Sequence, residues 1–180
     1  MKGQLIYVMG PSGAGKDTLL AWLRNHLPVQ SSVHWARRTI TRPVQPGDEQ
    51  HHSVDAPTFQ RLCDTQAFAL EWQANGLHYG VQHSELAPLD AGRRVIVNGS
   101  RAYLTQALEK FPDLKIIHVT TSIETLRARL LARGREAPEA VEARIHRAFA
   151  FQVPDRAIEV YNDGSLEDAG VQFLKAFEQD

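Results

Sequence analysis

The stretch "GPSGAGKDT", Gly10–Thr18, decides how the rest of the chain is interpreted. It follows directly on the apolar run "LIYVM", and Gly10, four further residues, Gly15 and Lys16 have the spacing of a phosphate-binding loop. In such a loop, backbone amides and the N-terminus of the next helix bind phosphate oxygens, and the lysine supplies a mobile cation. The predicted nucleotide-phosphate site comprises Gly10, Pro11, Ser12, Gly13, Ala14, Gly15, Lys16, Asp17 and Thr18, with glycines at backbone angles that a Cβ would forbid.

Asp17 departs from the commonest form of this loop, in which the lysine is followed by a Ser or Thr whose hydroxyl binds Mg²⁺. A carboxylate that pointed inward would repel the phosphates. We therefore expect Asp17 to face away or to contact Mg²⁺ through water, and Thr18 to reach the phosphates with its hydroxyl. An ordinary glycine-rich turn is the alternative, which the preceding strand, the lysine and the following helix disfavour.

Short apolar runs alternate with helical patterns along most of the chain. Strands are predicted for residues 4–9, 93–99, 114–121 and 157–162, and helices for 16–27, 100–111, 122–134, 136–152 and 165–179, with Ser122 and Ser165 as N-caps. This alternation predicts an α/β fold of three layers, α/β/α, around a central parallel sheet. Residues 34–84 break the rhythm, and "FALEW" and "LHYGV" within them favour short antiparallel strands. We predict one domain, 1–180, with a core of 1–33 and 85–180 and an insertion of about 34–84.

Composition narrows the class of protein. With 180 residues, 43% of them hydrophobic, and a formal net charge of −1, the chain has no global field to attract nucleic acid or a membrane. Its basic residues are five lysines and fifteen arginines, and arginine grips phosphate bidentately. Cys63 is the only cysteine, which favours a reducing compartment and hence the cytoplasm, and helical neighbours favour a core position for it. The four histidines His51, His52, His78 and His83 lack the spacing of a zinc site, so no metal ligands are assigned.

Four further segments, in the right order, resemble the guanylate kinase family. "RRTITRPVQPGDE" is similar to "S-x-x-TTRxxRxGE", and "FALEWQANGLHYGV" to "LLExxxxxxxxYGT". "RLLARGREAPEAVEARI" is similar to the family's lid, in which one Arg precedes a Gly and another follows eleven residues later, and "VYNDGSLEDA" to "NDDLxxA". The resemblance implies a P-loop kinase that uses ATP and Mg²⁺. It further implies a helical lid of about 133–147 carrying the catalytic Arg133 and Arg144, and acceptor-binding residues in the insertion and after it: Arg38, Arg42, Glu71, Tyr79 and Asn98.

Departures from that pattern alter the expected substrate. Gln45 stands at the position of a phosphate-binding Arg, His51 at that of a Tyr, Val81 at that of a base-reading Ser or Thr, and Arg38 at that of a Ser. A site without these donors discriminates guanine poorly. Together with "GPSGAGKDTLL", "RRTITRP" and "VNGSRAYL", the pattern resembles the ribose 1,5-bisphosphate phosphokinases of bacterial phosphonate degradation. That resemblance implies transfer of the γ-phosphoryl group of ATP to the 1-phosphate, giving 5-phospho-α-D-ribose 1-diphosphate (PRPP).

Two alternatives stay open at this point: a true guanylate kinase and a non-catalytic guanylate-kinase-like binding module. Arg38 and Arg42 are expected in the acceptor pocket, facing the phosphate loop, where they would bind a small phosphorylated substrate. In the lid, Arg135 and Arg147 could join Arg133 and Arg144, whereas for Arg127, Arg129 and Arg147 a solvated helix face is the favoured interpretation. Asn98 stands where related kinases often carry an Asp for magnesium-bound water. Oligomeric state is not indicated.

Overall fold

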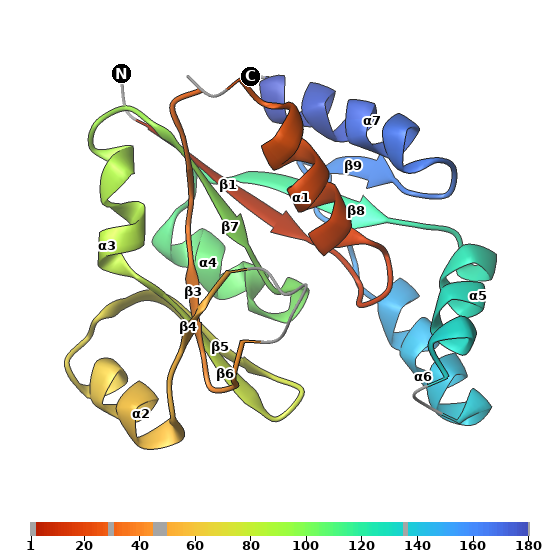
Figure 1. The fold of residues 1–180 in the computed structure, drawn as a ribbon, viewed down its shortest axis with the longest axis horizontal. Coiled ribbons are helices and arrows are strands. Elements are labelled where there is room, and N and C mark those ends of the chain that lie inside the picture. Colours follow the sequence, from red (N-terminus) through yellow and green to blue (C-terminus); the bar gives the residue numbers. More distant parts are fainter. Residues whose placement is uncertain (1–2, 29–30, 45–49, 135–136, 180) are drawn as a thin grey trace. The chain divides into compact units, whose positions relative to one another are not determined.

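The apolar run before the phosphate loop forms strand β1 (Gln4–Met9) in the computed structural model, which describes residues 3–28, 31–44, 50–134 and 137–179. β1 is the middle strand of a five-stranded sheet with the order β2-β7-β1-β8-β9 (Figure 1). Its other strands are β2 (Val33–Trp35), β7 (Arg94–Asn98), β8 (Lys115–Thr120) and β9 (Ile158–Tyr161). The pairs β2–β7 and β8–β9 are parallel, and the three inner strands β1, β7 and β8 are almost fully buried, as expected for a sheet covered by helices.

The predicted helices are present, with most ends within a few residues of the expected ones. They are α1 (Lys16–His26), α4 (Leu104–Lys110), α5 (Ile123–Arg133), α6 (Pro138–Phe149) and α7 (Leu166–Glu178). A 3₁₀ turn, Arg101–Tyr103, takes the place of the expected first turn of α4. Ser122 and Ser165 accept hydrogen bonds from the backbone at Thr125 and Asp168, so both predicted N-caps are confirmed. In the part of the chain that the structure describes, no helix is long and apolar enough to cross a membrane.

The chain divides into two compact units. The first comprises Met1–Tyr7 and Gln30–Lys115, and the second Val8–Val29 and Ile116–Asp180. The first contains β2, β7 and the segment that was predicted as an insertion. The second contains the phosphate loop and the predicted lid.

A second sheet, of four strands in the order β4-β3-β6-β5, lies in the first unit. It consists of β3 (Arg38–Ile40), β4 (His52–Ser53), β5 (Phe68–Ala74) and β6 (Leu77–Gln82). The predicted antiparallel hairpin is confirmed: β5 and β6 are joined by Asn75 and Gly76, whose φ angles of 51° and 73° suit a two-residue hairpin turn. Helix α2 (Ala56–Asp64) covers one face through the stacked rings of Phe59 and Phe68, and the short α3 (His83–Leu86) follows β6.

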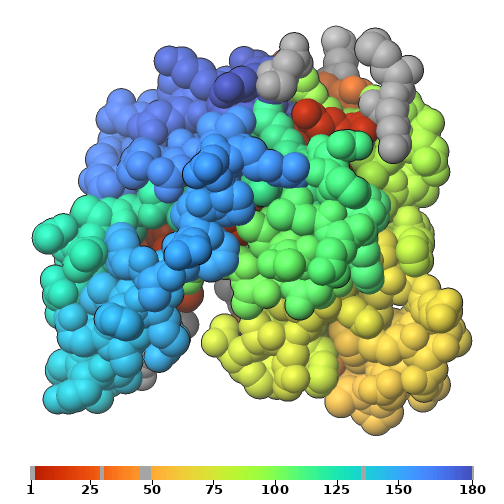
Figure 2. All heavy atoms as spheres, turned by 180° about the vertical axis from the view of Figure 1, so that it is seen from behind, coloured from red at the N-terminus to blue at the C-terminus, as the bar shows by residue number. Residues whose placement is uncertain are grey.

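In the second unit, α1 packs on α7 and α5 packs on α6. Trp22 lies against Gly170, and its indole N–H donates to Glu167, so this tryptophan packs α1 on α7. Leu126, Leu130, Val141, Ile145 and Ala148 form the buried core between α5 and α6. In Figure 2 the surface of α5 and α6 continues without a break into that of α7.

Candidate active site

The phosphate loop connects β1 to α1 with the geometry that its spacing predicts. Gly15 is the N-cap of α1, and its carbonyl accepts from the amide of Leu19, while the amide of Ala14 donates to the carbonyl of Pro11. The first-turn amides, which point toward the N-terminal end, and the positive end of the 11-residue helix are therefore next to the loop. The predicted strand and helix, with the loop between them, are therefore confirmed. Such an arrangement stabilises anions.

Two different constraints make glycine necessary in this loop. Gly13 and Gly15 have φ angles of 101° and 86°, in the left-handed region, as predicted. Gly10 is not among the residues with a positive φ, so the prediction is wrong for this glycine. Its constraint is close packing, since a Cβ at Gly10 would lie 2.3 Å from the carbonyl oxygen of Val119 in β8.

Lys16 and Asp17 form an ion pair at the start of α1. The lysine Nζ lies 3.0 Å from Oδ1 of Asp17, and the two side chains are 14% and 70% exposed. The carboxylate thus lies at the surface, where an ion pair contributes only about 0–1 kcal/mol. A phosphate group can therefore replace Asp17 as the partner of Lys16 at little cost. Thr18 is exposed in the same turn.

Asn162 and Arg129 hold the phosphate loop through its Ala14 carbonyl, and sequence reasoning missed both roles. Asn162 is 5% exposed, and its Nδ2 donates to the carbonyl of Ala14 at 2.7 Å. Arg129 donates to the carbonyl of Asn162 at 2.8 Å and to that of Ala14 at 3.4 Å. The interpretation of Arg129 as part of a solvated helix face is therefore wrong. The available signal was the Asn of "VYNDGSLEDA", which the resemblance to "NDDLxxA" had already marked.

Asp163, the next residue, fixes the beginning of α5. Its Oδ1 accepts from the Thr121 hydroxyl at 2.7 Å and from the Ser122 amide at 2.8 Å. Burial raises the pKa of Asp163, but these hydrogen bonds outweigh it and lower the pKa from 3.8 to about 2. The carboxylate is therefore ionised at neutral pH. Asn162 and Asp163 together join the phosphate loop to the beginning of α5.

Helices α5 and α6, which contain most of the predicted lid, carry its arginines at different depths. Arg133 is the last residue of α5 and is exposed, and Gly134 ends the helix with a φ of 60°. Arg144 is half-buried on α6, and Arg147 is exposed, as a solvated face requires. Arg127 binds Glu142 of α6 through two hydrogen bonds, one of them 2.9 Å long. Arg135, a further predicted lid residue, lies outside the described residues.

Packing joins these helices to the phosphate loop. A Cβ placed on Gly13 would lie 2.8 Å from Cδ1 of Leu126 and 3.2 Å from Cδ2 of Leu130, both in α5. The same two leucines belong to the core between α5 and α6. The loop, α5 and α6 therefore share one packed interior, which links the position of the loop to the two helices that carry Arg133 and Arg144.

In the first unit, Arg38 and Tyr79 lie together on one face of the four-stranded sheet. The guanidinium carbon of Arg38 is 5.5 Å from the centre of the Tyr79 ring, which in turn stacks on Trp72 at 5.6 Å. Arg42 follows β3, and its carbonyl lies 3.3 Å from Nε2 of the buried His51. Two of the predicted acceptor residues are thus brought together, with the phenol ring orienting the guanidinium. Gln45, at the position of the family's second Arg, lies outside the described residues.

Glu71 is not brought to this face. It pairs with Gly80, whose neighbours are the ring of Phe68 and hence the α2 side, while Trp72 pairs with Tyr79. The carboxylate of Glu71 accepts from the Cys63 thiol of α2 at 3.0 Å. Because successive residues of a strand point to opposite faces, Glu71 and Tyr79 lie on opposite sides of the sheet.

Cys63 and Asn98 complete the predicted positions. Cys63 is half-buried rather than in the core, and burial, reinforced by Glu71, raises its thiol pKa to about 11. A thiol with such a pKa is not a nucleophile at neutral pH. Asn98 ends β7 and is 2% exposed. Among the described residues, no three His, Cys, Asp or Glu side chains form a group that could hold a metal ion.

Comparison with known proteins gives a consistent assignment. No family model matches the chain. It is 44% identical over 170 residues to ribose 1,5-bisphosphate phosphokinase PhnN of Pseudomonas paraeruginosa, covering 93% of this chain and 91% of the relative. It is 43% identical over 179 residues to the protein of the same name from Janthinobacterium sp. (strain Marseille), covering 98% of this chain but only 39% of that relative. The chain thus spans about two fifths of the length of the second relative.

The crystal structure of guanylate kinase from Anaplasma phagocytophilum is similar to the whole fold. Its TM-score is 0.71 at 19% sequence identity, with 99% of this chain and 88% of that chain covered. At this identity the likeness shows the fold alone, and it confirms the predicted three-layer α/β/α arrangement of a P-loop kinase. On the near full-length identity to the Pseudomonas relative, the chain belongs to the ribose 1,5-bisphosphate phosphokinase PhnN family.

Proposed function

We propose that this chain transfers the γ-phosphoryl group of ATP to the 1-phosphate of ribose 1,5-bisphosphate, giving 5-phospho-α-D-ribose 1-diphosphate and ADP. The observation that carries the proposal is the 44% identity to a relative of that name over 91% of the relative's length. A phosphate loop with Lys16 at the N-terminus of α1 supports the donor half of the reaction. The single cysteine suits a reducing cytoplasm.

The chemistry requires alignment and neutralisation of charge. An oxygen of the acceptor 1-phosphate attacks the γ-phosphorus, and the bond from that phosphorus to the β–γ bridging oxygen breaks, so ADP leaves. The attacking oxygen is already anionic, and no general base is needed. Catalysis then depends on cations around the three equatorial oxygens of the transferring group.

Lys16 and the loop amides are the donor-side groups. Lys16 binds the β- and γ-phosphates in exchange for its surface partner Asp17. Arg133 and Arg144 close over the transferring group, and the packed core of α5 and α6 carries both of them. These roles follow the family's motif and are proposals for this chain.

Magnesium fits the oxygen donors of this loop. Mg²⁺ prefers hard oxygen ligands and usually keeps several waters, with one or two protein groups and the substrate phosphates. The hydroxyl of the exposed Thr18 and the carboxylate of the exposed Asp17 both lie in the first turn of α1. Thr18 would hold the ion directly and Asp17 through water, and the ion would neutralise charge on the β- and γ-phosphates.

Arg38 and Arg42 are the proposed acceptor-binding residues, and Tyr79 orients the first of them. An acceptor with phosphates at both ends needs cations at both ends, and charge-assisted bidentate bonds are the strong ones. Asn98 is proposed as a further polar contact, and its amide carries no charge to repel a bisphosphate.

A guanylate kinase activity is disfavoured by the geometry of the hairpin. Val81, at the position of a base-reading hydroxyl, is fully buried, and the Glu71 carboxylate is bonded to Cys63 on the α2 side. Unpaired polar groups of guanine would face this apolar position at considerable cost. The non-catalytic binding module is disfavoured by the complete phosphate loop.

The test is release of ADP from ATP and Mg²⁺ with either ribose 1,5-bisphosphate or GMP as acceptor. The proposal predicts turnover with the bisphosphate and at most slight turnover with GMP. Preference for GMP would make the chain a guanylate kinase. No turnover with either acceptor, together with tight peptide binding, would support the binding module.

A further inference from the structure

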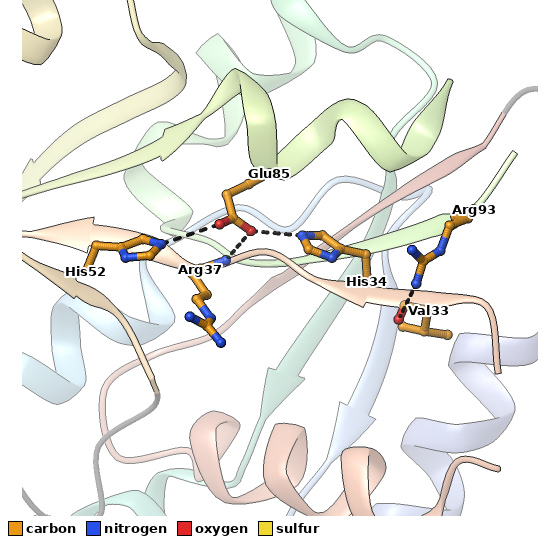
Figure 3. Close-up of polar contacts among 6 residues, drawn as sticks. All are labelled: Val33, His34, Arg37, His52, Glu85 and Arg93. Carbon is orange, nitrogen blue, oxygen red and sulfur yellow. Dashed lines mark hydrogen bonds and ion pairs between the residues drawn. The ribbon is translucent and has the colours of Figure 1, made fainter. Parts of the chain in front are cut away.

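The carboxylate of Glu85 joins three other segments of the first unit. Its Oε2 accepts from the backbone amide of Arg37 at 3.0 Å and lies 2.8 Å from Nε2 of His34. Its Oε1 lies 3.5 Å from Nε2 of His52. Figure 3 shows the two imidazoles and the amide converging on this one side chain, which is only 15% exposed. A shielded carboxylate with one backbone donor and two imidazole partners is well anchored.

These partners come from both sheets. His34 is in β2, which belongs to the five-stranded sheet, and His52 is in β4 of the four-stranded sheet. Arg37 lies in the two-residue link between β2 and β3. The other amide of that link, at Ala36, donates to the carbonyl of Ile96 in β7 at 3.0 Å. Both amides of the link are therefore held, one by a neighbouring strand and the other by Glu85.

The bond from Arg37 acts on the backbone and not on its side chain. The Arg37 guanidinium is exposed and points away from the Glu85 carboxylate (Figure 3). The next residue along the chain is Arg38, the first of β3, whose guanidinium lies over the Tyr79 ring. A shift of the backbone at Arg37 would therefore move the start of β3 and with it the guanidinium of Arg38.

The charge of Glu85 strengthens this arrangement. Burial by itself raises the pKa of the carboxyl group, but the hydrogen bonds from the Arg37 amide and from His34 outweigh burial and lower the pKa below its usual value. Glu85 is thus ionised at neutral pH, and its bonds are charge-assisted, which makes them shorter and stronger than neutral ones. The titratable groups that face it are His34 and His52.

We propose that Glu85 is a positioning residue for the acceptor site, which it serves by fixing the backbone at Arg37 and hence the place of the Arg38 guanidinium. The inference rests on the proposed function. It assigns to α3 a part in substrate choice that none of the predicted site residues carries. Misplacement of a binding group by about 1 Å can cost up to about a hundredfold in rate, so a modest shift is measurable.

Three variants separate positioning from folding. Glu85→Ala removes the acceptor of the Arg37 amide, Glu85→Asp keeps the charge but shortens the reach, and Glu85→Gln keeps an oxygen at the same distance. The control is Asp90→Asn, which removes an exposed carboxylate of the same unit. KM for ribose 1,5-bisphosphate, KM for ATP, kcat and the unfolding temperature are measured for each.

The inference predicts that Glu85→Ala and Glu85→Asp raise the acceptor KM about tenfold and leave the ATP KM within about twofold. Glu85→Gln should keep an acceptor KM close to that of the wild type. If Glu85→Ala fails to fold, Glu85→Asp decides. An unchanged acceptor KM in folded Glu85→Asp, or an equal rise in both KM values, overturns the inference while the proposed function stands. Wild-type protein that does not use the bisphosphate overturns both.

Discussion

The phosphate loop and the acceptor region differ in what carries their chemistry. In the loop, backbone amides would bind the phosphates, and the glycine and lysine spacing is enough to predict them. In the acceptor region, side chains on a four-stranded sheet would bind the ligand, and a change of one residue in a hairpin moves a side chain to the other face. The first region is therefore predictable from local spacing, whereas the second also depends on strand register.

The largest effect is expected from Lys16→Ala. The variant removes the cation proposed to bind the transferring phosphates, and it shortens a side chain that is only 14% exposed. We expect kcat to fall at least about a thousandfold in a protein that still folds, with a cooperative unfolding transition. Single-turnover measurement of ADP release checks this, with Lys175→Ala, an exposed lysine of α7, as the control. Near-normal turnover by the folded variant would contradict the loop mechanism.

Arg38→Ser tests the other half of the comparison. Loss of a charge-assisted contact to one acceptor phosphate should raise the KM for ribose 1,5-bisphosphate about tenfold or more and leave the KM for ATP nearly unchanged. Arg61→Ser, at an exposed arginine of α2, is the control. If the acceptor KM stays the same, Arg38 does not bind the acceptor and only the kinase fold and family remain.

Asn162→Ala tests whether the support behind the phosphate loop affects ATP binding alone. It leaves the Ala14 carbonyl without its 2.7 Å donor and removes a buried amide. A lost buried hydrogen bond of this kind costs about 1–3 kcal/mol of folding stability. We expect a lower unfolding temperature and a KM for ATP raised several-fold, with the acceptor KM unchanged. Equal effects on both KM values would mean that Asn162 supports the fold in general and not the loop.

The smallest effect is expected from Asp17→Ser, which restores the commoner loop pattern. Because the carboxylate is exposed and pairs with Lys16 only at the surface, activity should stay within about threefold of wild type. The ratio of kcat to KM for ATP at saturating Mg²⁺ is the measurement. A collapse of kcat with an unchanged affinity for ATP would give Asp17 a direct catalytic role.

Sequence reasoning succeeded where local spacing determines geometry. The strand, loop and helix, the two serine N-caps and the β5–β6 hairpin all depend on residues close together in the chain. The contact from Asn162 to Ala14 spans 148 residues, and no local pattern contains it. Arg129 was assigned to solvent for the same reason, because helical periodicity does not reveal which carbonyls lie opposite a helix.

The position of Glu71 was predictable in principle. The family segment quoted above has eight residues between its Glu and its Tyr, whereas this chain has seven between Glu71 and Tyr79. Across a two-residue turn, a change of one residue places the two side chains on opposite faces. The matching letters suggested that the two side chains share a face, whereas the number of residues between them indicates opposite faces.

The identity of the product shows whether the chain transfers a phosphoryl group to the 1-phosphate of ribose 1,5-bisphosphate. Wild-type protein is incubated with ATP, Mg²⁺ and ribose 1,5-bisphosphate, and the phosphorus signals are followed by ³¹P NMR, with Lys16→Ala as the control. In wild type only, we predict loss of the 1-phosphate signal and growth of two coupled signals of a sugar diphosphate, distinct from those of ADP. The 5-phosphate signal should stay. Formation of ADP and inorganic phosphate without a sugar diphosphate would contradict the proposed function. Conversion of GMP in preference to the bisphosphate would also contradict it.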